Sequence, residues 1–207
     1  QIPITLMTIA GLAMASLGHS NDDLSASIQA DYQHRLSDMF KHFHANPELS
    51  TGEFKTAKKI AQELRAHGFN VTENVGGTGL VALLKNGTGP LVMMRADMDG
   101  LPVEEKTGLP YASTVTQLDP VTKKTFPVMH ACGHDTHIAI LMATAEVLSK
   151  HKDKIKGRIK FIFQPAEEGP PPGEEGGAKL MIKEGVLENP KVDAIFGLHI
   201  NSQTPVG

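Results

Sequence analysis

Residues 135–149 read DTHIAILMATAEVLS, a segment that is apolar on almost every side when it is wound into a helix. A helix without a polar face of its own is buried in the protein interior. Strand-like runs stand before and after it in the chain, at Phe126–Met129 and at Arg158–Phe163, which reads RIKFIF. The segment therefore predicts a helix that packs against a β-sheet.

Helical and strand-like patterns alternate along the rest of the chain. Apolar residues at spacings of three and four predict helices over 24–44 and 53–67, and a short helix begins at Ala178. The turn Asn86–Gly89 suggests a hairpin or a tight connection between the strands that flank it. This order predicts an α/β fold with three layers, α/β/α, around a mostly parallel central sheet. The further strands are expected over 69–72, 79–84, 91–94 and 192–198.

Size and composition describe an ordinary globular protein. A chain of 207 residues is long enough for one sizeable core and short for two full domains. Its net charge of −3, with both signs mixed along the chain, lacks the basic footprint of a nucleic-acid binder. With only 1 cysteine, an intrachain disulfide framework is excluded.

The beginning of the sequence differs from the rest. The run ITLMTIAGLAMA over 4–15 is too short to span a bilayer, but it has the length of a signal-peptide apolar region. Ala13-Met14-Ala15 would offer a small-residue cleavage site, so that the mature chain begins near Ser16. We therefore interpret residues 1–20 as the remnant of a signal peptide and expect a secreted or periplasmic protein. An N-terminal anchor or apolar arm, with a cytoplasmic location, is the alternative.

Acid, thiol and imidazole side chains follow the predicted strands at the points where the strands end. In open α/β sheets, ligands and catalytic groups gather beyond the carboxyl ends of strands. We therefore expect these side chains to meet at one edge of one sheet. Each motif alone is weak evidence, and their joint occurrence carries the hypothesis of a functional site. The residues are Asp97 and Asp99, Cys132 and His134, Glu167 and Glu168, and His199.

The chemistry of this set is that of a metal site. Thiolate, imidazole and carboxylate together suit Zn²⁺, Mn²⁺, Co²⁺ or Ni²⁺. Cys132 and His134 are two positions apart in a turn, so both can point into the same pocket. In the adjacent pair Glu167 and Glu168, one carboxylate can bind a metal while the other accepts a proton from water.

A cysteine nucleophile is the competing interpretation of the same residues. Cys132 could attack a substrate if His134 or His137 served as its base. That role would leave the glutamate pair, the aspartates and the histidine after the last strand without a function. We expect His137 to be structural or to support a ligand. The remaining histidines are expected on polar helix faces or near helix ends, as surface or capping residues, among them His42, His44, His67 and His151.

Four longer segments carry a resemblance to a known family. They read MRADMDGLPVEEKTGLPYAS (94–113), MHACGHDTHIAILMATAEVL (129–148), FIFQPAEEG (161–169) and GGAKLMIKEGVLENPKVDAIFGLHI (176–200). Together they resemble the M20 metallopeptidase family, within it the amidohydrolase branch of hippurate hydrolases, N-acyl-amino-acid amidohydrolases and auxin-conjugate hydrolases. The resemblance runs from about Leu24 to the last residue.

The resemblance implies a centre with two divalent metal ions. It implies that Cys132 bridges the two ions, with His134, Glu168 and His199 as further ligands. Glu167 would be the general base. Asp99 resembles the family's active-site acid, which supports a ligand without touching the metal. Asp97 stands where related peptidases carry a histidine ligand.

The resemblance also implies a reaction and a substrate class. Water activated by the two ions would give its proton to Glu167 and attack the amide carbonyl of an N-acyl amino acid or small peptide. Glu167 would then return the proton to the leaving amine. The implied partners are this small substrate and, for the longer protein, a second copy in a homodimer. Neither nucleic acid nor a membrane span in the mature chain is expected.

Three departures from the family pattern qualify the resemblance. The loop over 113–127 is longer than usual, and PPPGEE is inserted after the glutamate pair. The sequence stops at Gly207, where the family continues into a lid or dimerisation domain and a further histidine ligand. Residues 21–207 are therefore expected to be the N-terminal part of a catalytic metallohydrolase domain. The alternative is a truncated metal-binding domain with little or no activity of its own.

Overall fold

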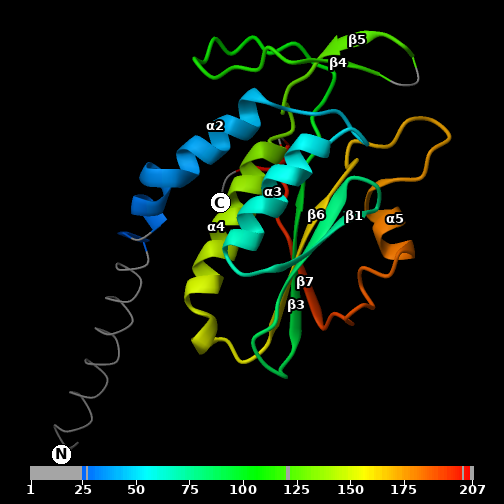
Figure 1. Cartoon of the computed structure of the whole chain (residues 1–207). Coiled ribbons are helices and arrows are strands. Elements are labelled where there is room, and N and C mark those ends of the chain that lie inside the picture. Colours follow the sequence, from blue (N-terminus) through cyan, green and yellow to red (C-terminus); the bar gives the residue numbers. More distant parts are fainter. Residues whose placement is uncertain (1–24, 27, 120–121, 202, 206–207) are drawn as a thin grey trace, which may run out of the picture. The chain divides into compact units, whose positions relative to one another are not determined.

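The computed structural model (Figure 1) describes residues 25–26, 28–119, 122–201 and 203–205. The chain divides into two compact units, residues 1–38 and 39–207. The described part of the first unit is helical and contains the π-helix η1 (Tyr32–Leu36) and the start of α2 (Ser37–Ala45). The predicted signal-peptide remnant over 1–20 lies outside the described residues. None of the described helices has the length and apolar character needed to cross a membrane.

The second unit is built on a sheet of five strands in the order β1-β2-β6-β3-β7. β6 and β7 both run parallel to β3, whereas β2 is antiparallel to both β1 and β6. The expectation of a mostly parallel sheet is therefore wrong, because the sheet is mixed. The bounds are β1 (Asn70–Val75), β2 (Gly79–Leu84), β3 (Leu91–Asp97), β6 (Arg158–Gln164) and β7 (Ala194–Gly197).

Short connections explain the antiparallel half of the sheet. Only a tight turn joins β1 to β2, and so short a connection can link antiparallel strands but not parallel ones. The suggested hairpin between β2 and β3 is wrong, because β6 lies between them. Gly87 and Gly89 pack on the entry to β6, where an added Cβ would lie 2.4 and 2.7 Å from the carbonyl oxygen of Lys156. Because these glycines have no side chain, the connection from β2 to β3 can pack closely against the start of β6, which lies between the two strands.

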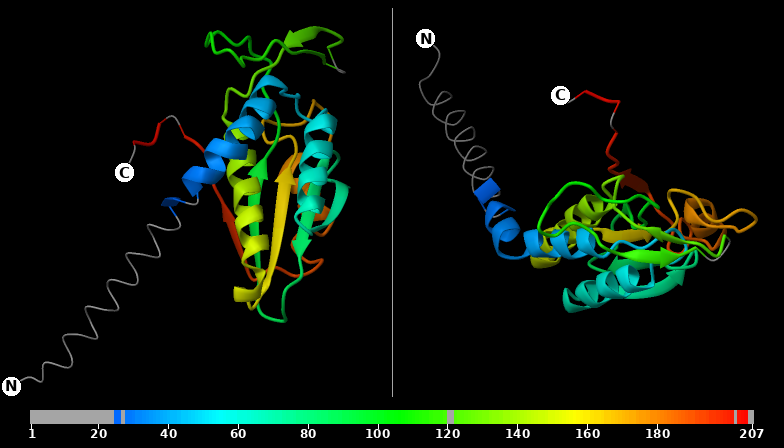
Figure 2. Two further views of the ribbon diagram at one scale, coloured as in Figure 1. Left: turned by 60° about the vertical axis from the view of Figure 1, so that its left-hand side comes forward. Right: turned by 90° about the horizontal axis from the view of Figure 1, so that it is seen from above.

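Helices cover both faces of the sheet, as the three-layer prediction required. α3 (Phe54–Ala66) and α4 (His134–Lys150) pack on one face and bury a core with Ile60, Leu64, Ile138, Met142 and Phe161. The left view of Figure 2 shows these two helices in front of the sheet. α5 (Gly177–Lys183) packs on the opposite face, where its Met181 joins a smaller core. The helix predicted over 135–149 is therefore present as α4, but only one of its faces is buried: Ile140 on the other face is 45% exposed.

A separate ribbon stands outside the main sheet. It pairs β4 (Thr116–Leu118) with β5 (Thr125–Pro127) in antiparallel register. The strand expected over 126–129 thus belongs to this ribbon and not to the central sheet. Beyond it, Met129 forms a bridge with Leu101, which follows β3 in the chain. This bridge returns the chain to the end of β3 just before α4 begins.

His44 is buried, which corrects the expectation that it lies at the surface. Its Nδ1 is 2.7 Å from Oδ2 of Asp135, and its Nε2 is 2.9 Å from Oε1 of Glu105. Burial by itself would lower the pKa of His44, but the two carboxylates outweigh it and raise the pKa above the usual 6.5. The imidazolium therefore ties α2 to the first turn of α4 and to the segment after β3.

The contribution of His44 to stability should depend on pH. A histidine whose pKa is raised in the folded state stabilises the fold fully below its unfolded pKa and loses this effect as pH rises through the folded pKa. We expect His44→Gln to lower the free energy of unfolding most at about pH 6 and progressively less towards about pH 9. Urea denaturation of both proteins across this range measures it. A difference that grows with pH would contradict the charged ion-pair assignment.

Candidate metal centre

Three neighbouring parallel strands deliver polar side chains to the same edge of the sheet. Asp97 ends β3 in register with Gln164 of β6, so Asp97 and the glutamates after β6 lie at one level. Arg95 of β3 pairs with the last residue of β7, which places His199 just beyond that edge. The expected convergence of the strand-end residues is therefore present for three of the four predicted segments.

The fourth segment arrives by another route. Cys132 and His134 follow the separate ribbon, and His134 is the first residue of helix α4. Gly133, between them, has a φ of 78°, a left-handed conformation that glycine adopts without steric cost. The turn thereby directs both side chains towards the ends of the parallel strands. Their position depends on the start of a helix and not, as expected, on a strand of the main sheet.

The side chains that could bind a metal form two overlapping groups, which include the predicted ligands together with Asp97 and His137. Ligand atoms of Cys132, His134 and Glu168 all lie within 4.8 Å of one another, and so do those of Asp97, His134, His137 and His199. Nε2 of His134 belongs to the centre of this cluster, 3.5 Å from Oε2 of Glu167 and 3.9 Å from Oε1 of Glu168. Nε2 of His199 lies 3.6 Å from Oδ2 of Asp97 and 3.9 Å from Sγ of Cys132.

Both central histidines are oriented as metal ligands. Nδ1 of His134 donates to the carbonyl oxygen of Asp99 at 2.8 Å, and Nδ1 of His199 donates to that of Ile200 at 2.7 Å. A carbonyl that accepts from Nδ1 fixes the tautomer in which Nε2 carries a lone pair. Nε2 of His134 is fully buried and has no hydrogen-bond partner among the described residues. A buried nitrogen with a free lone pair and no hydrogen-bond donor beside it fits a cation at the centre of the cluster.

Asp97 is buried in the cluster, between His137 and Arg95. Its Oδ1 accepts from Nδ1 of His137 at 2.6 Å, and its Oδ2 lies 2.5 Å from Nη1 of Arg95. Burial would raise the pKa of Asp97, but the bond from His137 and nearby positive charge outweigh it and lower the pKa. His137 also accepts from the backbone N–H of Ile200 at 3.1 Å. With both ring nitrogens engaged, His137 supports Asp97, in keeping with the expected supporting role.

Asp99 lies behind His134, on the side away from the centre of the cluster. Its Oδ2 accepts from the hydroxyl of Ser50 at 2.7 Å and from the backbone N–H of Glu168 at 2.9 Å. Its Oδ1 is 3.3 Å from Nδ1 of His134. Although burial opposes it, hydrogen bonding to His134 lowers the pKa of Asp99, so the carboxylate stays charged. Asp99 therefore contacts a histidine and a glutamate of the cluster, and its role in supporting a ligand stays a prediction.

The electrostatics of the cluster call for a cation. Burial, a hydrogen bond with Glu168 and the negative charges around it raise the pKa of the Cys132 thiol to about 12. A thiol in such a field is a poor free nucleophile, because only the thiolate attacks. A divalent cation would reverse this situation by stabilising the thiolate and the carboxylates together. The donor set of thiolate, imidazole and carboxylate suits Zn²⁺ and its neighbours.

A pocket opens beside the cluster. Its lining includes Phe40, His130, Cys132, His199 and Ile200. His130 is buried, and neither of its ring nitrogens has a hydrogen-bond partner among the described residues. Burial lowers its pKa to about 4, so the imidazole is neutral near pH 7. The pocket therefore lies next to the candidate metal ligands and is lined by both apolar and polar side chains.

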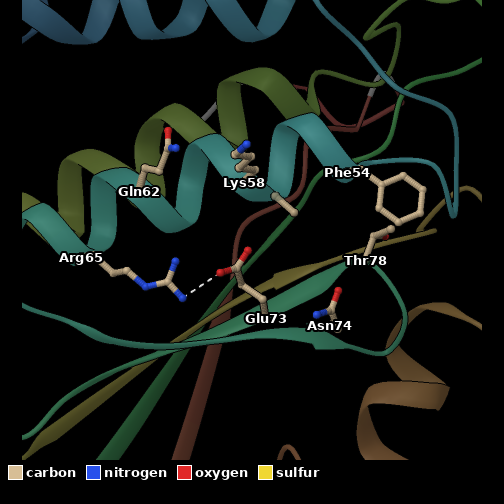
Figure 3. A pocket seen from close by; sticks show the side chains of 8 residues that line it. Phe54, Lys58, Gln62, Arg65, Glu73, Asn74 and Thr78 are labelled. Atoms are coloured by element: carbon tan, nitrogen blue, oxygen red, sulfur yellow. Dashed lines mark ion pairs between the residues drawn. The ribbon is translucent and has the colours of Figure 1, made fainter.

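A second pocket lies between α3 and β1, away from the predicted site residues (Figure 3). Arg65 and Glu73 form an ion pair of 2.7 Å across it. None of the residues that line this pocket belongs to the predicted metal site. The cluster at the ends of β3, β6 and β7 is thus the candidate functional site.

Fold and cluster together define a class: an α/β protein with a candidate metal centre at the carboxyl ends of its parallel strands. Residues 93–207 match peptidase family M20/M25/M40. The chain belongs to this family, and within it to the amidohydrolase branch.

Several relatives support this assignment. The chain is 47% identical to thermostable carboxypeptidase 2 of Saccharolobus solfataricus over 81% of its own length and 39% of the relative's. It is 41% identical to the hippurate hydrolase of Campylobacter jejuni over 82% of its length and 40% of that enzyme. The structure of the YXEP protein of Bacillus subtilis, described as a dinuclear metal-binding peptidase, aligns with a TM-score of 0.71 and 38% identity, over 86% of this chain and 45% of that one. The chain spans about 40% of the length of the curated relatives it matches.

Proposed function

We propose that this chain carries the metal-binding part of a hydrolase that cleaves the amide bond of N-acyl amino acids or small peptides. The observation that carries the proposal is the buried Nε2 of His134, which faces Glu167 and Glu168 and has no hydrogen-bond partner among the described residues. Relatives of the same family branch include a hippurate hydrolase and an N-acetyl-L-cysteine deacetylase. Both names describe hydrolysis of an acyl–nitrogen bond.

The cluster offers donors for two divalent ions, which we propose to be Zn²⁺, Mn²⁺, Co²⁺ or Ni²⁺. Cys132 would be one of the donors, because its Sγ lies 3.9 Å from Nε2 of His199 and within 4.8 Å of the ligand atoms of His134 and Glu168. His134, Glu168 and His199 would complete the ligand set. When bound, the ions would supply Lewis acidity that polarises the amide carbonyl and makes water more acidic.

Glu167 is the proposed general base. It follows Ala166 in the turn after β6, and its carboxylate lies 3.5 Å from Nε2 of His134 and 3.6 Å from Nε2 of His199. It is also partly exposed, so it can reach a water molecule at the mouth of the cluster. We propose that Glu167 accepts the proton of the attacking water and passes it to the leaving amine.

The pocket beside the cluster is the proposed place for the acyl group. Phe40 and Ile200 offer apolar surface there. Apolar surface next to the candidate metal ligands suits an acyl or aryl-acyl substituent.

Metal content and turnover test this proposal separately. The 207-residue chain, loaded with Zn²⁺ or Mn²⁺ and desalted, should retain about two ions per chain by elemental analysis, as the paired donor groups predict. The protein in its full natural length should then hydrolyse hippurate or N-acetyl amino acids, and should lose this activity on chelation. Stoichiometric metal without turnover would favour a metal-binding domain without activity. Failure to retain any ion would contradict the proposed centre.

A further inference from the structure

Glu53 is a buried carboxylate that takes no part in the proposed reaction. It stands at the residue before α3 and is fully buried. Residues at this position commonly use their side chains to accept from the first N–H groups of the helix, and serine, threonine, aspartate and asparagine are preferred. Glu53 makes no such side-chain bond. Burying a carboxylate is costly unless it is well bonded, so its contacts need an explanation.

Another glutamate caps the helix instead. Oε2 of Glu48 accepts from the backbone N–H of Thr56 at 2.8 Å, and its Oε1 accepts from that of Lys55 at 3.2 Å. Two of the free N–H groups in the first turn of α3 are thereby satisfied. The side chain of Glu53 is released from capping and turns into the protein.

The carboxylate of Glu53 binds the turn that precedes the proposed base. Its Oε1 accepts from the backbone N–H of Ala166 at 2.8 Å. Its Oε2 accepts from the hydroxyl of Thr78, which Figure 3 shows beside Phe54 at one end of the pocket between α3 and β1. Ala166 has a φ of 48°, in the left-handed region that is unfavourable for a residue with a side chain. Glu53 therefore holds a strained residue directly before Glu167.

The turn is held on its other side as well. The backbone N–H of Glu168 donates to Oδ2 of Asp99 at 2.9 Å. Glu167 thus lies between two backbone N–H groups, each bound to a buried carboxylate from a distant segment. One of these carboxylates, Asp99, also supports His134, whereas Glu53 touches none of the proposed ligands.

We infer that Glu53 is a positioning residue for the general base, because its bond to the N–H of Ala166 fixes the turn that presents Glu167. This inference rests on the proposed function of Glu167. The side chain of Glu53 bonds to the Thr78 hydroxyl and to the backbone N–H of Ala166, and neither residue is a proposed metal ligand.

The arrangement also explains why an ionisable group is kept in the interior. Burial raises the pKa of Glu53 to about 7, although the bonds from Thr78 and Ala166 oppose this effect. Burying a carboxylate costs free energy, and its contacts here hold the strained backbone of Ala166 in one conformation. The hydroxyl of Thr78 orients the carboxylate so that its other oxygen faces Ala166.

Two substitutions with opposite expectations test the inference. Glu53→Met keeps the length of the side chain and removes both acceptors. We expect it to lower kcat by about 10- to 100-fold with little change in KM, since a small misplacement of a catalytic group costs rate and not binding. Glu53→Gln can still accept from Ala166 with its amide oxygen and donate to Thr78. We expect this variant to keep kcat within about threefold of the parent value.

A second measurement does not depend on turnover. Hydrogen–deuterium exchange of the metal-free 207-residue chain reports the N–H of Ala166. Its exchange should speed up by about tenfold or more in Glu53→Met and remain slow in Glu53→Gln. Glu48→Ala is the matched control, because it removes a glutamate at the same helix start. It should lower stability but leave both kcat and the exchange of Ala166 unchanged.

The outcomes separate this inference from the proposed function. Unchanged exchange of Ala166 in Glu53→Met, or an equal loss of kcat in Glu48→Ala, would overturn the positioning role. If Glu167→Gln abolishes turnover while Glu53→Met leaves kcat intact, the positioning role fails and the proposed function stands. If Glu53→Met does not fold, Thr78→Val removes only the orienting hydroxyl. It should give a smaller loss of kcat and faster exchange of Ala166, and parent values for both would overturn the inference.

Discussion

Glu167→Gln should lower kcat for amide hydrolysis by about 10²- to 10⁴-fold, the contribution typical of a general acid–base residue. The substitution keeps the size and polarity of the side chain and removes only its ability to accept a proton. Glu167 lies beside Nε2 of both His134 and His199, but the proposed ligands do not depend on it. We therefore expect the bound metal to stay at the parent level while turnover falls.

The measurement is kcat at saturating N-acyl amino acid, with metal content determined on the same sample. Glu174→Gln is a matched control, because Glu174 is an exposed glutamate in the loop that follows the same turn. It should leave kcat unchanged. A Glu167→Gln protein that retains half or more of the parent kcat would show that another group accepts the proton.

Cys132→Ser should weaken the binding of at least one metal ion by more than about 100-fold. Loss of a residue that only supports a ligand typically lowers metal affinity by about 10- to 100-fold, and loss of a ligand itself should cost more. Cys132 lies within 4.8 Å of the ligand atoms of His134 and Glu168, and it is only partly buried, so its substitution should spare the fold. An alcohol stays protonated where a thiol ionises against a cation. The variant thus keeps the shape of the site and removes one charged donor.

Calorimetry of metal binding tests this prediction in two ways. Because the pKa of the Cys132 thiol is raised to about 12, metal binding near neutral pH should release its proton. Titrations in buffers with different ionisation enthalpies measure this release. The serine variant should release about one proton fewer per chain, in line with the loss of one thiol. Equal proton release and equal affinity in both proteins would remove Cys132 from the ligand set.

Part of the candidate site could be predicted from the sequence, because several of its polar residues come at the ends of clearly apolar runs. Asp97, Glu167 and His199 follow strands that proved to be parallel neighbours, so their meeting follows from strand direction alone. Helix α4 was equally visible in its apolar residues, although its full burial was not borne out, because Ile140 lies exposed. For these elements, the pattern of apolar residues in a short segment determines both the strand or helix and the position of the polar residue at its end.

What the sequence did not reveal depends on contacts between distant segments. The antiparallel placement of β2 results from strand order, which no run of residues encodes locally. His44 stands on a helix with polar neighbours, and its burial depends on Glu105 and Asp135, 61 and 91 positions away. Glu53 looks like an ordinary helix start until Glu48 is seen to cap α3. A glutamate where serine or aspartate is preferred was the one available signal.

The outer strand β7 has a practical consequence for work with this polypeptide. It pairs with β3 on one side, and Ile195 and Phe196 on it are 50% and 62% exposed. An apolar edge strand is a template on which another molecule can add its own strand. The 207-residue polypeptide, handled by itself, should therefore be prone to edge-to-edge aggregation as its concentration rises. Dilute samples, or a lysine in place of Phe196, would be the sensible starting point for its purification.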